Sequence, residues 1–69
     1  MEAKQLLKMC GFKKCTDNNN LIIYYFKSYS KCKITFQKKF HSFIVENTSI
    51  SIGLYKAITQ QMIELGWIK

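Results

Sequence analysis

Three thiols and one imidazole are the side chains of this 69-residue chain best suited to bind a metal or act as nucleophiles: Cys10, Cys15, Cys32 and His41. Their number matches a structural zinc site, but zinc ligands usually come in close pairs such as Cys-x2-Cys, and no such pair occurs here. The odd number of cysteines also disfavours a disulfide framework. Cys32 lies in an apolar alternating pattern in which a free thiol packs well. We therefore predict no metal site and no cofactor.

Catalysis by a nucleophile needs a base and an orienting group beside it. His41 is the only histidine, and its candidate partners Cys32, Asp17 and Glu46 are scattered along the chain. The four acidic residues are widely spaced, and the three glycines stand too far apart to form a phosphate-binding loop. The sequence thus predicts a protein without enzymatic activity.

Lysine dominates the charge of the chain. Eleven basic residues, all of them lysine, stand against four acidic ones, which gives a formal net charge of +7. Lysine is a hydrated point charge that attracts polyanions, whereas the flat guanidinium of arginine reads guanine edges and clamps phosphates. The lack of arginine disfavours sequence-specific reading of DNA. It leaves open nonspecific nucleic-acid contact, an acidic protein partner, or a surface that is only solvated.

The candidate binding residues lie in the middle of the chain. Lys31 and Lys33 alternate with apolar residues, and Lys38 and Lys39 follow in a turn. Aromatic residues interleaved with lysines resemble a platform on which single-stranded nucleic acid stacks its bases while its phosphates meet cations. Packing in a core explains the aromatic residues equally well. The predicted residues for binding a partner or nucleic acid are Lys31, Lys33, Lys38, Lys39, Tyr24 and Tyr25.

Three apolar stretches predict the strands that would position these residues. Residues 21–27 are apolar on both faces, as in a central strand or a strand that meets a partner chain. Residues 31–37 alternate cleanly between apolar and polar, and residues 40–46 form the third stretch. A brief strand around residues 12–15 is a further candidate, with the following asparagine run as its turn.

Two amphipathic segments predict helices. Ser51 can cap the first turn of a helix over residues 51–65, and Gly66 can end it in a left-handed conformation. A short helix over residues 3–10 would end in the same way at Gly11. Residues at helical spacing in the longer segment share one stripe that would cover the sheet: Leu54, Tyr55, Ile58, Met62 and Leu65.

Together these elements predict one small α+β domain over residues 1–69, in the order α-β-β-β-α. Its sheet would be a three-stranded antiparallel meander, with the long C-terminal helix and the short N-terminal helix on one face. One thin helical layer covers a single face, yet residues 21–27 are apolar on both. We therefore expect a second copy of the chain, as in a homodimer, or another protein to cover the spare face.

The C-terminal pattern, in which Ser-Ile-x-Leu leads through Lys-Ala-Ile-x-x-Gln to Glu-Leu-Gly-Trp-Ile, resembles that of small uncharacterised phage and prophage proteins. Those proteins also begin with a short helix ending in Gly-Phe or Gly-Tyr followed by Lys, an Asn-rich turn and a Tyr-containing strand. Because the shared positions are caps and core residues, the resemblance transfers no catalytic residue. The three cysteines and the strong basic charge depart from the pattern. The matching residues are Gly11, Phe12, Lys13, Lys14, Asn18 to Asn20, Tyr24 or Tyr25, and residues 52–68.

Size, charge and this resemblance predict a non-enzymatic phage accessory protein of the anti-defence or anti-CRISPR kind. It would bind and inhibit a host protein or nucleoprotein through an acidic surface of that partner. The alternative is a nonspecific single-stranded nucleic-acid-binding protein that uses a lysine and aromatic sheet face. No signal-peptide pattern and no apolar run of about 18 residues is visible, so we expect no membrane partner and a location in the host cytoplasm.

Overall fold

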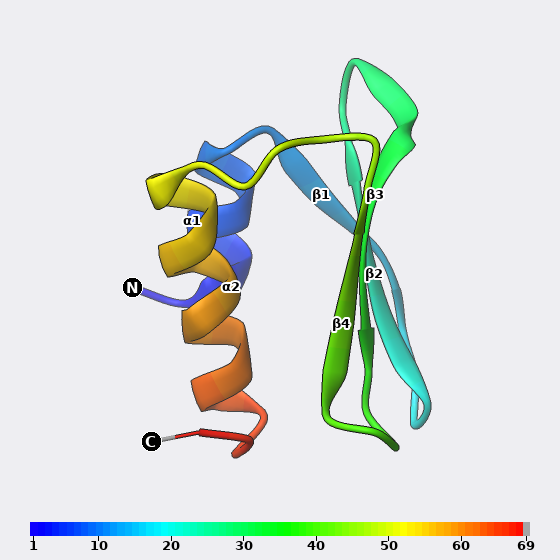
Figure 1. Ribbon diagram of the computed structural model, residues 1–69, viewed down its shortest axis with the longest axis vertical. Helices are drawn as coiled ribbons and strands as arrows, with labels where there is room; N and C mark the ends of the chain where they lie inside the picture. Colours follow the sequence, from blue (N-terminus) through cyan, green and yellow to red (C-terminus); the bar gives the residue numbers. More distant parts are fainter. Residues whose placement is uncertain (69) are drawn as a thin grey trace.

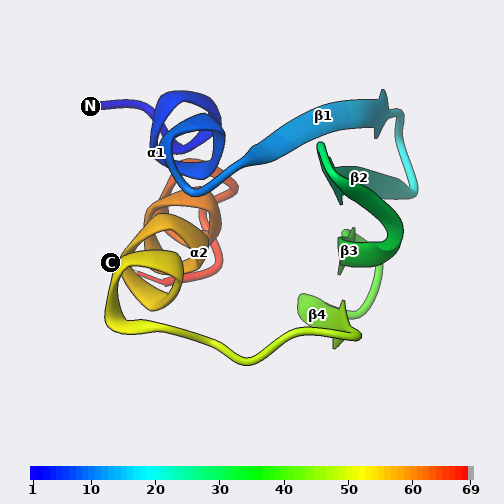
Figure 2. The same ribbon diagram turned by 90° about the horizontal axis from the view of Figure 1, so that it is seen from above.

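Two helices pack on one face of a four-stranded antiparallel sheet in the computed structural model, which describes residues 1–68 (Figures 1 and 2). The strands lie side by side in chain order, β1-β2-β3-β4. The α+β class and both helices agree with the sequence-based prediction. In chain order the elements are α1 (Ala3–Met9), β1 (Phe12–Asp17), β2 (Leu21–Phe26), β3 (Tyr29–Gln37), β4 (Ser42–Glu46) and α2 (Ile52–Glu64).

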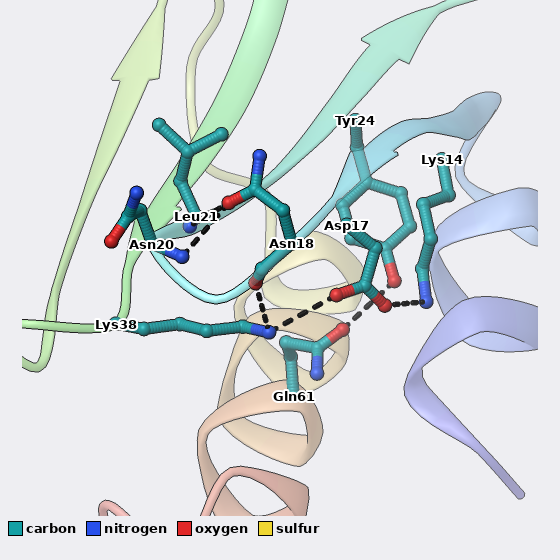
Figure 3. A network of polar contacts seen from close by, with 8 residues as sticks. All are labelled: Lys14, Asp17, Asn18, Asn20, Leu21, Tyr24, Lys38 and Gln61. Atoms are coloured by element: carbon teal, nitrogen blue, oxygen red, sulfur yellow. Dashed lines mark hydrogen bonds and ion pairs between the residues drawn. The ribbon is translucent and has the colours of Figure 1, made fainter.

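The predicted number of three strands is wrong, because the stretch FKKCTD forms β1, an additional edge strand paired with β2. Its alternation is weak in the sequence, since Phe12 is its only large apolar residue. Pairing with β2 and a tight turn hold it in place. In that turn, Asn18 Oδ1 accepts hydrogen bonds from the backbone N–H groups of Asn20 (2.8 Å) and Leu21 (3.0 Å) (Figure 3). The strand suspected at residues 12–15 therefore exists and extends to Asp17.

Two strand starts also differ from the predicted ones. Strand β3 begins at Tyr29 rather than at residue 31, because the turn from β2 occupies only Lys27 and Ser28. Strand β4 begins at Ser42 rather than at residue 40, and His41 in the preceding turn has a left-handed backbone (φ 51°). The alternation within β3 is as predicted, with Cys32, Ile34 and Phe36 buried.

The core lies between the sheet and the two helices. Leu54 and Ile58 of α2 are buried there, as predicted, and Met62 and Leu65 pack partly against them. Tyr55 does not join this stripe, because 62% of it is exposed. The sheet-facing side of α2 is centred on Leu54, Ala57, Ile58 and Gln61, which leaves Tyr55 on the outer side.

The ends of α2 are formed by local hydrogen bonds that the sequence predicted. Ser51 Oγ accepts a hydrogen bond from the N–H of Leu54 at 3.1 Å, which caps the first turn. Gly66 has a left-handed backbone (φ 78°), and the N–H of Trp67 donates to the carbonyl of Met62 at 2.9 Å, as in a Schellman ending. Within residues 1–68, no helix is long and apolar enough to cross a membrane.

Candidate functional site

The face of the sheet that points away from both helices is uncovered, and we call it the open face. Cross-strand partners place alternate residues of the strands together on this face, for example Tyr25 opposite Lys33 and Thr35 opposite Ile44. In Figure 2, α1 and α2 lie on the other side of the sheet. The open face consists of Lys13, Thr16, Leu21, Ile23, Tyr25, Lys31, Lys33, Thr35, Gln37, Ser42, Ile44 and Glu46.

The centre of the open face is apolar. Leu21, Ile23 and Tyr25 of β2 are half-buried by their neighbours, and Ile44 of β4 is 45% exposed. The predicted apolar residues on both faces are present in β2 (Leu21–Phe26), because its other side buries Ile22 and Tyr24 under the helices. Lys27, the last residue of the predicted strand, lies instead in the following turn. The open face thus offers apolar surface that no helix of residues 1–68 covers.

A hollow of about 410 Å³ lies at one end of the open face. Lys33 Nζ lies 6.0 Å from the centre of the Tyr25 ring and 3.9 Å from Glu46 Oε1. Asn47, which has a left-handed backbone (φ 59°), donates a side-chain hydrogen bond to the carbonyl of Lys31 at 2.8 Å. These contacts shape a shallow basin that combines an aromatic ring with two ammonium groups. Its lining residues are Tyr25, Ser30, Lys31, Lys33, Glu46 and Asn47.

The structure brings together only three of the six predicted binding residues. Tyr25, Lys31 and Lys33 meet at this hollow. Lys38 and Lys39 lie in the turn between β3 and β4, at the opposite end of β3 (Figure 1). Lys39 is exposed, with its Nζ 5.9 Å from the centre of the Phe40 ring.

Lys38 and Lys14 are held by ion pairs with Asp17 (Figure 3). Each ammonium lies 3.1 Å from an oxygen of the Asp17 carboxylate, and Lys38 also donates to the carbonyl of Asn18 at 2.6 Å. These hydrogen bonds, first that from Lys38 and then that from Lys14, lower the pKa of Asp17 below its ordinary value. Lys38 therefore links the β3–β4 turn to the β1–β2 turn.

Tyr24 cannot contact a partner in the folded protein, because its side chain is fully buried under the helices. Adjacent residues of a strand point to opposite faces, so Tyr24 and Tyr25 cannot share one platform. The hydroxyl of Tyr24 donates a hydrogen bond to Gln61 Oε1 at 2.8 Å (Figure 3). Burial raises the pKa of Tyr24 to about 12, so the hydroxyl stays protonated, and can donate this bond, even in alkaline solution.

The thiols and the imidazole do not assemble into a site. Cys32 is buried in the core, Cys10 is half-buried and Cys15 is exposed. His41 instead stacks on Trp67, with ring centres 5.2 Å apart and planes 8° from parallel. Among residues 1–68, no three His, Cys, Asp or Glu side chains gather closely enough to hold a metal ion.

A second group of lysines gathers between α1 and β1, and no sequence pattern marked it as a group. The sequence shows only two local pairs of lysines. Lys4 and Lys8 are one helical turn apart, and Lys13 and Lys14 follow the Gly11 cap. Only the packing of α1 beside β1 brings the two pairs together. We call this hollow of about 320 Å³ the lysine hollow; it is lined by Lys4, Lys8, Phe12, Lys13, Lys14 and Lys27.

No protein-family model, curated protein or solved structure matches this chain. The resemblance to small phage proteins therefore stays a prediction.

Proposed function

We propose that this protein is a non-enzymatic binding protein whose open face docks on an acidic surface of a host protein or nucleoprotein. The observation that supports this proposal is the uncovered apolar centre of the open face, with Ile23, Tyr25 and Ile44 accessible on it. Protein interfaces bury such a centre and surround it with polar groups. The lysines at its border, Lys31 and Lys33, supply the complementary charge for an acidic partner.

The make-up of the open face favours a protein over single-stranded nucleic acid as its ligand. Unpaired bases stack on aromatic rings, and of the two tyrosines predicted to form a platform only Tyr25 lies on this face, because Tyr24 is buried. Its other apolar residues, Leu21, Ile23 and Ile44, are aliphatic and suit the core of a protein interface.

Inhibition of host machinery is the biological role we propose for this docking, in the cytoplasm of the host cell. Its support is the resemblance of the C-terminal segment to phage proteins together with the small size of the chain. A protein of this kind acts by occupying a surface in a stoichiometric complex, so it needs an exposed docking face rather than a catalytic cluster. The open face meets that requirement.

A second copy of the chain is the other candidate for covering the open face. Three lysines on this face, Lys13, Lys31 and Lys33, stand against one acid, Glu46, so two such faces would bring like charges together. We therefore place the acidic partner first. Light scattering over a concentration series distinguishes the two occupants of the open face. If the wild type has twice the mass of one chain and Ile44→Asp has the mass of one chain, the open face belongs to a homodimer.

Binding measurements with open-face variants test the proposal. A partner captured from host lysate is purified, and its affinity and stoichiometry with this protein are measured by calorimetry. Ile44→Asp should lower the affinity by at least about tenfold, because it puts a charge into the apolar centre of the interface. Lys31→Glu with Lys33→Glu should weaken binding and its salt dependence, whereas Lys56→Glu on the exposed side of α2 should not.

Two results would contradict the proposal. If the wild type and Ile44→Asp bind the partner with equal affinity, and circular dichroism shows that both proteins are folded, the partner does not use the open face. Binding of bare single strands at physiological salt that Tyr25→Ala abolishes would favour the single-stranded nucleic-acid alternative instead.

A further inference from the structure

The lysine hollow concentrates five of the 11 lysines of the chain around one opening. Lys4 and Lys8 lie one turn apart on the exposed side of α1. Gly11, with its left-handed backbone (φ 93°), then turns the chain so that β1 starts directly beside the helix. The N–H of Lys27 donates to the carbonyl of Gly11 at 2.9 Å, which brings the β2–β3 turn to the same place.

Most of the charge in the lysine hollow is uncompensated. No carboxylate lines it, and Lys14 is the one of its five lysines that forms an ion pair within residues 1–68, with Asp17 at 3.1 Å. Like charges at helical spacing, such as Lys4 and Lys8, repel each other. An anion that enters the hollow relieves this repulsion, so the local potential favours a ligand with several negative charges.

We propose that the lysine hollow is a sequence-independent binding site for the phosphate backbone of double-stranded nucleic acid. Its cations come from α1, β1 and the β2–β3 turn, which suits a ligand that presents several phosphates in a row. Lysine contacts with phosphates release the counterions of the duplex and need no base contact. The lack of arginine agrees with a site that does not read bases.

The walls of the lysine hollow argue against the two other ligand classes. Phe12, its apolar residue, is only 3% exposed, so the hollow offers an acidic protein no exposed apolar side chain as an anchor. The cores of protein interfaces are depleted in lysine, which makes such a contact weak. The same burial of Phe12 removes any ring on which unpaired bases could stack, so single strands gain nothing over a duplex.

This site is separate from the open face and does not depend on its proposed partner. The lysine hollow is lined mainly by residues of α1 and β1, and Ile44 belongs to β4. Strands β1 and β4 are the two edges of the sheet (Figure 2). Lys13 is the one residue that borders both. The substitution Ile44→Asp should therefore weaken partner docking and leave duplex binding unchanged.

Fluorescence anisotropy with a labelled duplex of about 20 base pairs tests the proposal at a series of salt concentrations. The variant Lys4→Gln with Lys8→Gln removes two exposed lysines of the hollow. The matched control, Lys39→Gln with Lys56→Gln, removes two exposed lysines elsewhere and lowers the net charge equally. The hollow variant should bind about tenfold more weakly, and the slope of log affinity against log salt should fall by about 1.8 because two phosphate contacts are lost.

The control variant should lose less than about threefold in affinity, since it changes only the general attraction between the protein and the duplex. Equal losses in both variants would overturn the site and leave a diffuse attraction by the whole basic surface. Tighter binding of a poly-glutamate peptide than of the duplex would also overturn it, in favour of an acidic protein ligand. Tighter binding of a single strand that Tyr25→Ala abolishes would move the nucleic-acid contact to the open face.

Discussion

The two faces of the sheet are built from the same strands but differ in what surrounds their side chains. Tyr24 and Tyr25 are neighbours in β2, yet Tyr24 is fully buried beside Gln61 of α2, whereas Tyr25 stays accessible beside Lys33. Ile34 and Ile44 likewise lie on adjacent strands, one buried and one 45% exposed. The helices, rather than the residue types of the strands, therefore decide which apolar residues stabilise the fold and which remain free to bind.

The isoleucines of the two faces provide the largest expected contrast. Ile34→Ala should lower the free energy of unfolding by about 2–5 kcal/mol, because it opens a cavity in the core under α2. Ile44→Ala should change that free energy by less than about 1 kcal/mol, because its side chain is already half in water. Urea unfolding followed by circular dichroism measures both values.

A small domain tolerates only a limited loss of stability, so Ile34→Val serves as a milder second variant. Ile34→Val should lower the free energy of unfolding by about 0.5–1.5 kcal/mol, and Ile44→Val should leave it nearly unchanged. Equal losses at residues 34 and 44 would mean that the open face is covered in solution, for example by a second copy of the chain.

The adjacent tyrosines Tyr24 and Tyr25 allow the two faces to be compared by removing a single hydroxyl group. Tyr24→Phe should cost about 1–3 kcal/mol of unfolding free energy, because it leaves Gln61 Oε1 buried without its hydrogen-bond donor. Tyr25→Phe should stay within about 0.5 kcal/mol, since that side chain is half-buried at the surface. The double variant Tyr24→Phe with Gln61→Leu should recover most of the loss, because both buried polar groups are then removed.

The raised pKa of Tyr24 adds a pH dependence that Tyr24→Phe should remove. Because its pKa rises from about 10 when unfolded to about 12 when folded, the folded state holds this proton more tightly. Its contribution to stability is therefore complete below about pH 10 and is lost as the pH rises through about 12. Urea midpoints measured between neutral pH and this range should fall more steeply for the wild type than for Tyr24→Phe.

The smallest expected effect concerns the neighbouring lysines of the β3–β4 turn. Lys38 pairs with Asp17, whereas Lys39 lies over Phe40. Lys38→Gln should raise the pKa of Asp17 toward its ordinary value, and Lys39→Gln should leave it unchanged. NMR titration of the Asp17 carboxyl group measures both shifts.

The lowered pKa of Asp17 also predicts the direction of its effect on stability. The folded state releases this proton more readily than the unfolded state, so its contribution is present above about pH 4 and is lost as the pH falls through the folded pKa. The Asp17 side chain is 44% exposed, so the contribution should stay below about 1 kcal/mol. An acid transition that is identical in the wild type and Lys38→Gln would show that the ion pair contributes nothing.

The features that could be predicted from the sequence are those set by contacts within a few residues. The Ser51 cap, the Gly66 ending and the alternation of β3 all follow from side-chain type and spacing along one helix or strand. The α+β class and the two-sided apolar character of β2 follow from the same periodicities. Strand β1 was harder to predict, because a short edge strand rich in lysine has little alternation of its own.

Contacts between residues far apart in the chain were decided only by the tertiary structure. The pairing of Lys38 with Asp17 spans 21 residues, and that of Tyr24 with Gln61 spans 37. A two-residue period shows that the faces of β2 differ, but with apolar residues on both it does not show which face the helices cover. The packing of the helices on one face buries Tyr24 and leaves Tyr25 accessible. It also places α1 beside β1, where the lysines of these two elements gather. The physical reason is that burial depends on which elements pack together, whereas a sequence pattern reports only the periodicity of each element.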